Sequence, residues 1–227
     1  MMQNGFNSLY MSYLYGKVKE RFSFLSTDCD IKKSGDCAQV VFRAEKEYCP
    51  YIRKFVEENM ADIIVVGYKY AYFEKRLRLP LLSNMQKRIL LTALVAADYK
   101  EDKIYVRRRL RGYKQYCLDG LFYFRLTDLK RRWEEIVEYI PTDMGEASMD
   151  GFLEFLTEEG EGKLFLKDGR VYGDDYRPLS KSLLTGVKSP VGEILLGGAE
   201  EVYCFGEADE NTRAFLKKYY GEKVIFC

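Results

Sequence analysis

The fold is decided by residues 98–140, which read DYKEDKIYVRRRLRGYKQYCLDGLFYFRLTDLKRRWEEIVEYI. This stretch holds the only tryptophan, the densest positive charge and the clearest helical spacing of apolar residues. On a first predicted helix, steps of three and four place on one face Val106, Leu110, Tyr113 and Cys117. A second predicted helix, capped by Thr127 or Asp128 and stopped by Pro141, carries Leu126, Leu129, Trp133, Ile136, Val137 and Ile140. We therefore expect two amphipathic helices, joined around Leu118, Asp119 and Gly120, at the centre of the fold.

The other face of the first helix is basic and is the candidate binding site. It consists of Arg107, Arg108, Arg109, Arg111 and Lys114, interleaved with tyrosines. Guanidinium groups pair with phosphates and aromatic rings stack on bases, so this face is a candidate for nucleic acid or another acidic partner. The alternative is that these cations are solvated or pair internally with the acidic segment of residues 143–161. The balance of 36 basic against 35 acidic residues favours the alternative.

Length and composition predict a globular protein with a sizeable core, because 47% of the 227 residues are hydrophobic and 31% are charged. The expected class is α+β, with a mostly helical N-terminal and central body and a small C-terminal mixed sheet. We expect residues 1–140 to form a helical region with one short strand. Residues 141–227 would form a small α/β region, packed on the first as one compact unit.

The individual elements follow from local patterns. We expect a helix over residues 6–24, a polar loop over 26–36, a strand over 38–43 and a helix over 85–97. A long helical register spans residues 45–79 with Gly67 as its weak point, although its run of residues 63–66 could instead be a buried strand. Towards the C-terminus, Asp168 and Gly169 lie between two short apolar strands and predict a β-hairpin. Residues 201–226 then predict a small βαβ unit.

Several classes of chemistry are disfavoured. The chain has no histidine, which removes the commonest general base and metal ligand. Its six cysteines contain no CxxC pair, so we expect reduced thiols in a cytoplasm, no metal site and no cofactor. The glycines between Gly192 and Gly198 precede a predicted strand, so they favour a helix cap over a phosphate loop. No apolar run has the length of about 20 residues that a membrane span needs.

A run in the middle of the chain resembles a known family. Asp119, Gly120, Phe122, Phe124 and Arg125, followed by Leu126, look like the "DGF, any residue, FRL" signature of the YtxC-like sporulation family of spore-forming Firmicutes. The C-terminal order of a strand, a helix and a closing strand with a V-x-x-C ending is also similar, so the resemblance covers about the last 130 residues. It implies a role in sporulation and brings no catalytic residues with it.

Three hypotheses of function follow. One is binding through the basic face, as described above. Another is an enzyme that uses Asp119 with Arg125, or Cys204, although Asp119 before Gly120 is more typical of a turn or a helix cap. The hypothesis we favour is a non-enzymatic cytoplasmic protein of sporulation that acts through contacts with an unknown protein partner.

Overall fold

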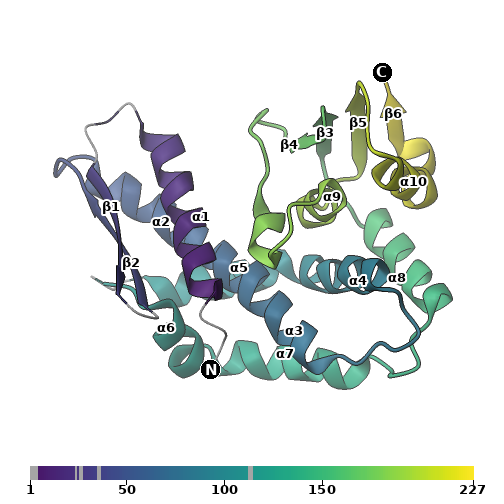
Figure 1. Cartoon of the computed structure of the whole chain (residues 1–227), viewed down its shortest axis with the longest axis horizontal. Coiled ribbons are helices and arrows are strands. Elements are labelled where there is room, and N and C mark those ends of the chain that lie inside the picture. Colours follow the sequence, from purple (N-terminus) through teal and green to yellow (C-terminus); the bar gives the residue numbers. More distant parts are fainter. Residues whose placement is uncertain (1–4, 24, 26–27, 35–36, 112–114) are drawn as a thin grey trace.

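The structure is a computed structural model that describes residues 5–23, 25, 28–34, 37–111 and 115–227. Helices form most of the molecule, with a two-stranded sheet near the N-terminal helix and a four-stranded sheet at the C-terminal end (Figure 1). The predicted α+β class, with its mostly helical body and small C-terminal mixed sheet, is therefore confirmed. None of the helices in the described ranges is long and apolar enough to cross a lipid bilayer.

The helical body follows the chain from the N-terminus. Its elements are α1 (Gly5–Phe22), β1 (Asp28–Ser34), β2 (Cys37–Arg43), α2 (Cys49–Asp62), a π-helix (Ile63–Tyr68), α3 (Lys69–Arg76), α4 (Asn84–Ala97), α5 (Tyr99–Leu110), α6 (Leu118–Arg125), α7 (Thr127–Tyr139) and α8 (Glu146–Glu158). Ser83 begins α4 with a capping box, in which its hydroxyl accepts from the Gln86 N–H and the Gln86 side chain accepts from the Ser83 N–H.

The N-terminal sheet corrects one prediction. Residues 28–34, expected within a polar loop, form β1 and pair antiparallel with β2, so the first region has two strands instead of one. Polar strands of this kind are stabilised by their neighbour: Asp30 and Arg43 form an ion pair of 2.9 Å, and α1 contacts both strands. The sequence of β1 does not predict a strand, because it lacks the apolar alternation that marks a half-buried strand.

The long predicted helix is confirmed, and the strand alternative for residues 63–66 is wrong. α2, the π-helix and α3 run on continuously, and all six residues of the π-helix are buried. Gly67 lies inside this π-helix, where a larger residue has no room: a Cβ atom there would lie 2.6 Å from Cε1 of Tyr10 on α1. A short run of apolar residues is as typical of a buried helix as of a buried strand. The sequence therefore left both the helix and the strand open for residues 63–66.

The basic stretch is divided differently from the prediction. α5 ends at Leu110, because Arg111 already has an extended backbone, and Cys117 begins a separate helix by accepting from the Gly120 N–H at 3.4 Å. Leu118, Asp119 and Gly120 therefore lie in the first turn of α6 and do not join two helices. Val106 and Leu110 are buried as expected, but Cys117 is exposed, and Tyr113 lies outside the described residues.

The C-terminal region contains β3 (Lys163–Lys167), β4 (Arg170–Tyr172), a 3-10 helix (Lys181–Thr185), α9 (Pro190–Gly197), β5 (Glu201–Phe205), α10 (Glu210–Tyr219), a second 3-10 helix (Gly221–Lys223) and β6 (Val224–Phe226). Its sheet has the order β4-β3-β5-β6. The predicted hairpin is confirmed, with positive φ angles of 49° at Asp168 and 70° at Gly169, as a type I′ turn requires. β5 and β6 are parallel around α10, as the predicted βαβ unit requires, and Gly198 ends α9 in the left-handed conformation.

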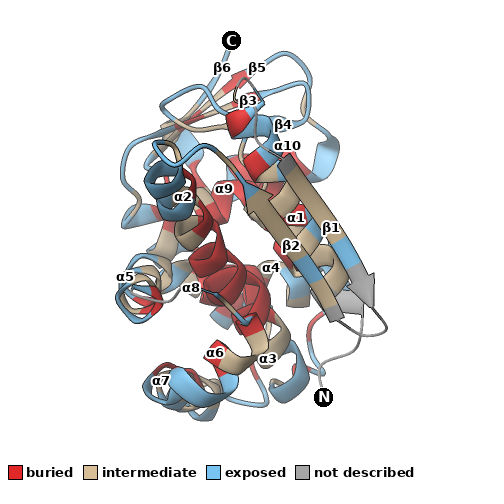
Figure 2. Cartoon of the chain, turned by 90° about the vertical axis from the view of Figure 1, so that its left-hand side faces the viewer, coloured by how far each residue is buried: buried red, intermediate tan, exposed pale blue. Residues whose placement is uncertain are grey.

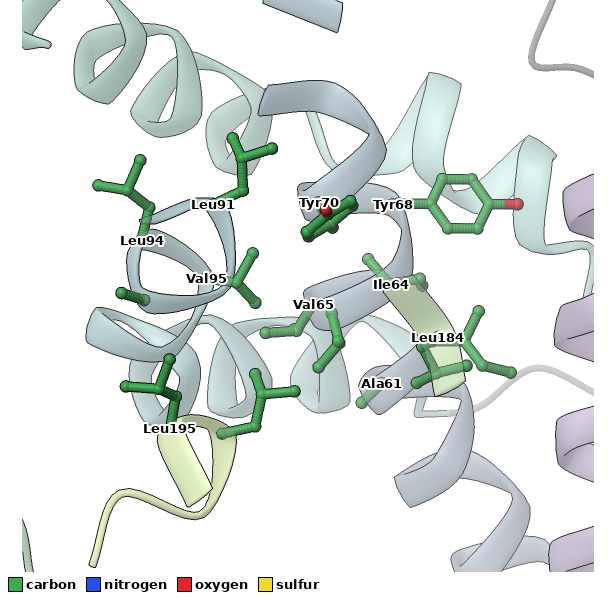
Figure 3. Close-up of a cluster of buried hydrophobic side chains, with 14 of the residues drawn as sticks. Ala61, Ile64, Val65, Tyr68, Tyr70, Leu91, Leu94, Val95, Leu184 and Leu195 are labelled. Atoms are coloured by element: carbon green, nitrogen blue, oxygen red, sulfur yellow. The ribbon is translucent and has the colours of Figure 1, made fainter. Parts of the chain in front are cut away.

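One hydrophobic cluster extends from the helical body into the C-terminal region. Leu129 and Trp133 of α7 are fully buried in it, as predicted, and Ile136 is partly buried. Figure 3 shows the part of this cluster where the π-helix, α4 and α9 meet, and Figure 2 shows that the buried residues concentrate on these central helices. The division of the chain near residue 140 stays a prediction.

Candidate functional site

The predicted basic face lies on α5 and is partly paired within the protein. Arg107 lies 3.3 Å from Glu58 of α2, and Arg109 lies 3.5 Å from Asp128 of α7. Arg108 and Arg111 are exposed, and Lys114 lies outside the described residues. The internal partners that the structure shows for these arginines come from α2 and α7, whereas residues of the acidic segment 143–161 pair with Lys100 and Lys218. Binding of nucleic acid by this face stays a prediction.

The signature residues on α6 fall into two groups, and the first group anchors the helix. Tyr68 of the π-helix donates to Asp119 Oδ1 at 2.8 Å, and Phe122 is buried between the rings of Tyr68 and Trp133. Gly120 leaves room for the Cys117 cap, since a Cβ atom there would lie 3.3 Å from the Cys117 sulfur. These contacts fix α6 against the centre of the helical body.

The second group of signature residues faces outward. Phe124 is 81% exposed, and Arg125 and Tyr123 beside it are also exposed. Asp119 and Arg125 therefore stand in different environments: Asp119 serves as the acceptor for Tyr68, and Arg125 ends the helix in solvent. This separation gives no support to the hypothesis that the two act as a catalytic pair.

A buried charge network lies where α3, α5 and α7 meet, and the sequence did not predict it. Asp102 Oδ2 accepts from Lys69 Nζ at 2.9 Å and from Trp133 Nε1 at 2.8 Å, and Arg132 approaches its other oxygen at 3.3 Å. Lys69 Nζ also lies 3.4 Å from Asp98 and close to the face of the Trp133 ring. Every polar atom of the Lys69–Asp102 pair thus has a partner, as a charge buried in a protein interior requires.

A second network flanks the other end of the π-helix. Asp62 accepts from the hydroxyl of Tyr99 and lies 2.6 Å from Lys103, and Lys181 lies 4.2 Å from the centre of the Tyr99 ring. Burial, with the nearby charge of Asp62, raises the pKa of Tyr99 well above its usual value. Burial also lowers the pKa of Lys181. Both networks connect the π-helix to α5, so their geometry suits the positioning of helices.

The spacing of the charged residues in these networks could be seen in the sequence, but their partners could not. Asp62 and Lys69 are seven residues apart, which places them on the same side of a helix, and Asp98 and Asp102 are four apart. Such spacing is equally typical of a solvated surface. Nothing in the local sequence shows that Lys69, a residue type that is rarely buried, faces the interior.

A pocket of about 390 Å³ lies where the first turns of α4, α9 and α10 meet, and Arg88 and Lys188 belong to its lining. The two later helices are capped by their own residues: Ser189 Oγ accepts from the Gly192 N–H, and Asp209 Oδ1 accepts from the Thr212 N–H.

The remaining catalytic candidate, Cys204, lies in β5 and is buried. Burial raises the pKa of its thiol, which lowers the fraction of reactive thiolate. In the described part of the chain, no group of three or more histidine, cysteine, aspartate or glutamate residues could hold a metal ion. Comparisons of the chain with protein-family models, with curated proteins and with solved structures found no match. The resemblance to the sporulation family therefore stays a prediction from the sequence.

Proposed function

We propose that this chain is a non-enzymatic cytoplasmic protein of sporulation that acts by binding a protein partner. The process comes from the resemblance of residues 119–126 to the YtxC-like signature. The binding region we assign is the α6 surface, defined as Tyr123, Phe124 and Arg125. The observation that carries this proposal is the 81% exposure of the Phe124 ring on a helix whose opposite side is fixed in the core.

The anchoring of α6 is what distinguishes Phe124 from a scattered surface residue. Aromatic and arginine side chains dominate the binding energy of protein interfaces, where they are desolvated together. Asp119 and Phe122 hold α6 through Tyr68 and Trp133, so the α6 surface is already ordered before a partner arrives. A preformed surface loses less conformational entropy on binding, which favours affinity.

The cysteines support the compartment that we propose. Cys49, Cys117, Cys204 and Cys227 are free thiols, and three of the four are exposed. Exposed thiols persist in the reducing environment of a cytoplasm, whereas secreted proteins of oxidising compartments commonly pair them.

The test uses sporulating cells and three versions of the protein. Deletion of the gene should reduce spore formation, and the unaltered chain should restore it. A Phe124→Ser variant should be stable but should fail to restore spore formation and should lose the partner in affinity purification. Tyr139→Ser is the matched control, because Tyr139 is an equally exposed aromatic residue on α7. Normal spore formation in the deletion strain would refute the process, and full activity of Phe124→Ser would refute the surface.

A further inference from the structure

The C-terminal sheet has one face packed in the interior and one face turned outward. Leu164, Leu166, Val171, Val202 and Cys204 are buried on the inner face, and α9 contacts β3 and β4. Because side chains alternate along a strand, the residues between them point to the other side. We define the aromatic sheet face by six of these outward residues, Phe165, Lys167, Arg170, Tyr172, Tyr203 and Phe205.

Three rings of the aromatic sheet face lie side by side on β3 and β5, and Tyr172 of β4 is next to them in register. Phe165 of β3 is paired in register with Tyr172 of β4 and with Tyr203 of β5. The centre of the Phe165 ring lies 5.6 Å from that of Tyr203 and 6.4 Å from that of Phe205. A continuous aromatic row on the outer side of a small sheet is the arrangement on which unpaired bases stack.

A loop residue already demonstrates that a flat ring fits there. Tyr176, which is 72% exposed, stacks on Phe165 with 4.9 Å between ring centres and 24° between ring planes. Its backbone has a φ of 55°, a left-handed conformation that costs a residue with a side chain. The loop therefore holds an exposed ring at stacking distance on this face in spite of backbone strain, and such strain concentrates at ligand-binding segments.

Two cations complete the surface. Lys167 and Arg170 are directly opposite each other in the register of β3 and β4, both are exposed, and neither forms an ion pair with a residue that the structure describes. Like charges directly opposite repel each other, so an anion between them would be stabilising. Of the acidic residues around this region, Glu201 pairs with Lys163 at 3.1 Å and Asp175 with Arg177 at 3.5 Å, while Asp168 lies in the turn between the two cations.

From this combination we propose that the aromatic sheet face binds single-stranded nucleic acid. Its bases take the place of the Tyr176 ring on Phe165 and stack beside it on Tyr203 and Phe205, and Lys167 with Arg170 contacts its phosphates. A single strand fits because its bases are free to stack on the protein, whereas those of a duplex stack on one another. This activity is separate from the α6 surface, which lies on a helix of the helical body and not on the sheet.

Binding is measured by fluorescence anisotropy of a fluorescein-labelled oligothymidylate at increasing salt. We expect a dissociation constant of about 10 µM, and a slope of log affinity against log salt of about −1.4 for two phosphate contacts. Phe165→Leu keeps an apolar side chain but removes the flat ring, so affinity should fall about tenfold. Lys167→Gln with Arg170→Gln should bring the salt slope close to zero.

Control variants and thermal melts distinguish loss of the binding site from loss of the fold. Tyr139→Ala removes an exposed ring from α7, and Arg108→Gln with Arg111→Gln removes exposed cations at the C-terminal end of α5; neither change should affect binding. Thermal melts establish that each variant is folded. The proposal would be overturned by equal binding of a matched duplex, by undiminished affinity of folded Phe165→Leu, or by loss of binding in the α5 variant alone. A folded protein that binds no oligonucleotide would also overturn it, and would leave this face to a protein partner.

Discussion

Lys69 Nζ lies 2.9 Å from Asp102 Oδ2, and the two side chains are 0% and 2% exposed. Lys69 directly follows the π-helix, and Asp62, directly before it, pairs with Lys103 of the same partner helix, α5. The charged residues on either side of the π-helix thus pair with two consecutive residues of α5, Asp102 and Lys103. Both pairs are lost if α5 shifts along the π-helix, so they favour the observed placement of the two helices.

Removal of the Asp102 carboxylate should be strongly destabilising. Asp102→Ala leaves Lys69 buried without its closest partner and Trp133 Nε1 without an acceptor, so we expect a loss of about 3–5 kcal/mol in the free energy of unfolding. Urea denaturation measures it. The matched control is Asp128→Ala on α7, an exposed carboxylate that pairs with Arg109, for which the expected cost is about 1 kcal/mol or less. Equal costs for the two variants would contradict the role assigned to Asp102.

Two helical glycines should respond to alanine in opposite directions. Gly67→Ala places a methyl group 2.6 Å from the Tyr10 ring, so we expect a destabilisation of about 1–3 kcal/mol. Gly16→Ala meets no atom within 4 Å and removes backbone freedom from the unfolded chain, so we expect about 0.5–1 kcal/mol of stabilisation. Both are read from urea denaturation. A stabilising Gly67→Ala would mean that Tyr10 does not pack on the π-helix.

Stability should be lost in strong alkali, because buried tyrosines resist ionisation. Burial raises the pKa of Tyr70 to about 12, and burial together with the hydrogen bond to Asp150 raises the pKa of Tyr219 to about 12. The unfolded value is about 10, so this contribution is complete below about pH 10 and disappears as the pH rises towards about 12.

Urea midpoints measured across this alkaline range provide the test, alongside the ultraviolet absorbance of tyrosinate. Tyr219→Phe removes one of the raised pKa values, so its midpoint should depend less on pH between about 10 and 12 than that of the unaltered protein. Identical pH dependence of the two proteins would show that Tyr219 ionises equally easily in the folded and unfolded states.

The hairpin turn of the C-terminal sheet should tolerate only residues that accept positive φ. Gly169→Ala forces a side chain into a φ of 70°, at a cost of about 1–2 kcal/mol. Asp168→Asn should be nearly neutral, because asparagine accepts the left-handed conformation well. Gly151→Ala, in the open first half of α8, is the control and should be stabilising. Thermal denaturation distinguishes these outcomes, and a neutral Gly169→Ala would exclude the type I′ geometry.

Much of the fold was predictable because its patterns are local. The spacing of Val106 with Leu110 and of Leu129 with Trp133 identified the buried faces of α5 and α7. Asp168 with Gly169 identified the hairpin, since few residue pairs fit its backbone. In each case, neighbours in the sequence supply the deciding interactions.

The candidate sites were less predictable because their residues come from distant segments. The signature residues of α6 were found in the sequence, but their separation into buried Phe122 and exposed Phe124 was not. The pattern of β3, with Lys163, Phe165 and Lys167 on one side, gave no reason to expect Tyr176 or Tyr203 beside Phe165. These contacts depend on the return of the chain to the same sheet.

Local periodicity and turn chemistry were therefore enough to establish the class, most helices and the hairpin, since a few neighbouring residues fix each backbone conformation. Folding of the whole chain settled three other matters: the pairing of Lys69 with Asp102, the strand made from polar residues 28–34, and the outward aromatic face. The physical reason is that a charge, a polar strand or a ring gains its stability from a partner far away in sequence. The spacing of residues along the chain does not identify that partner.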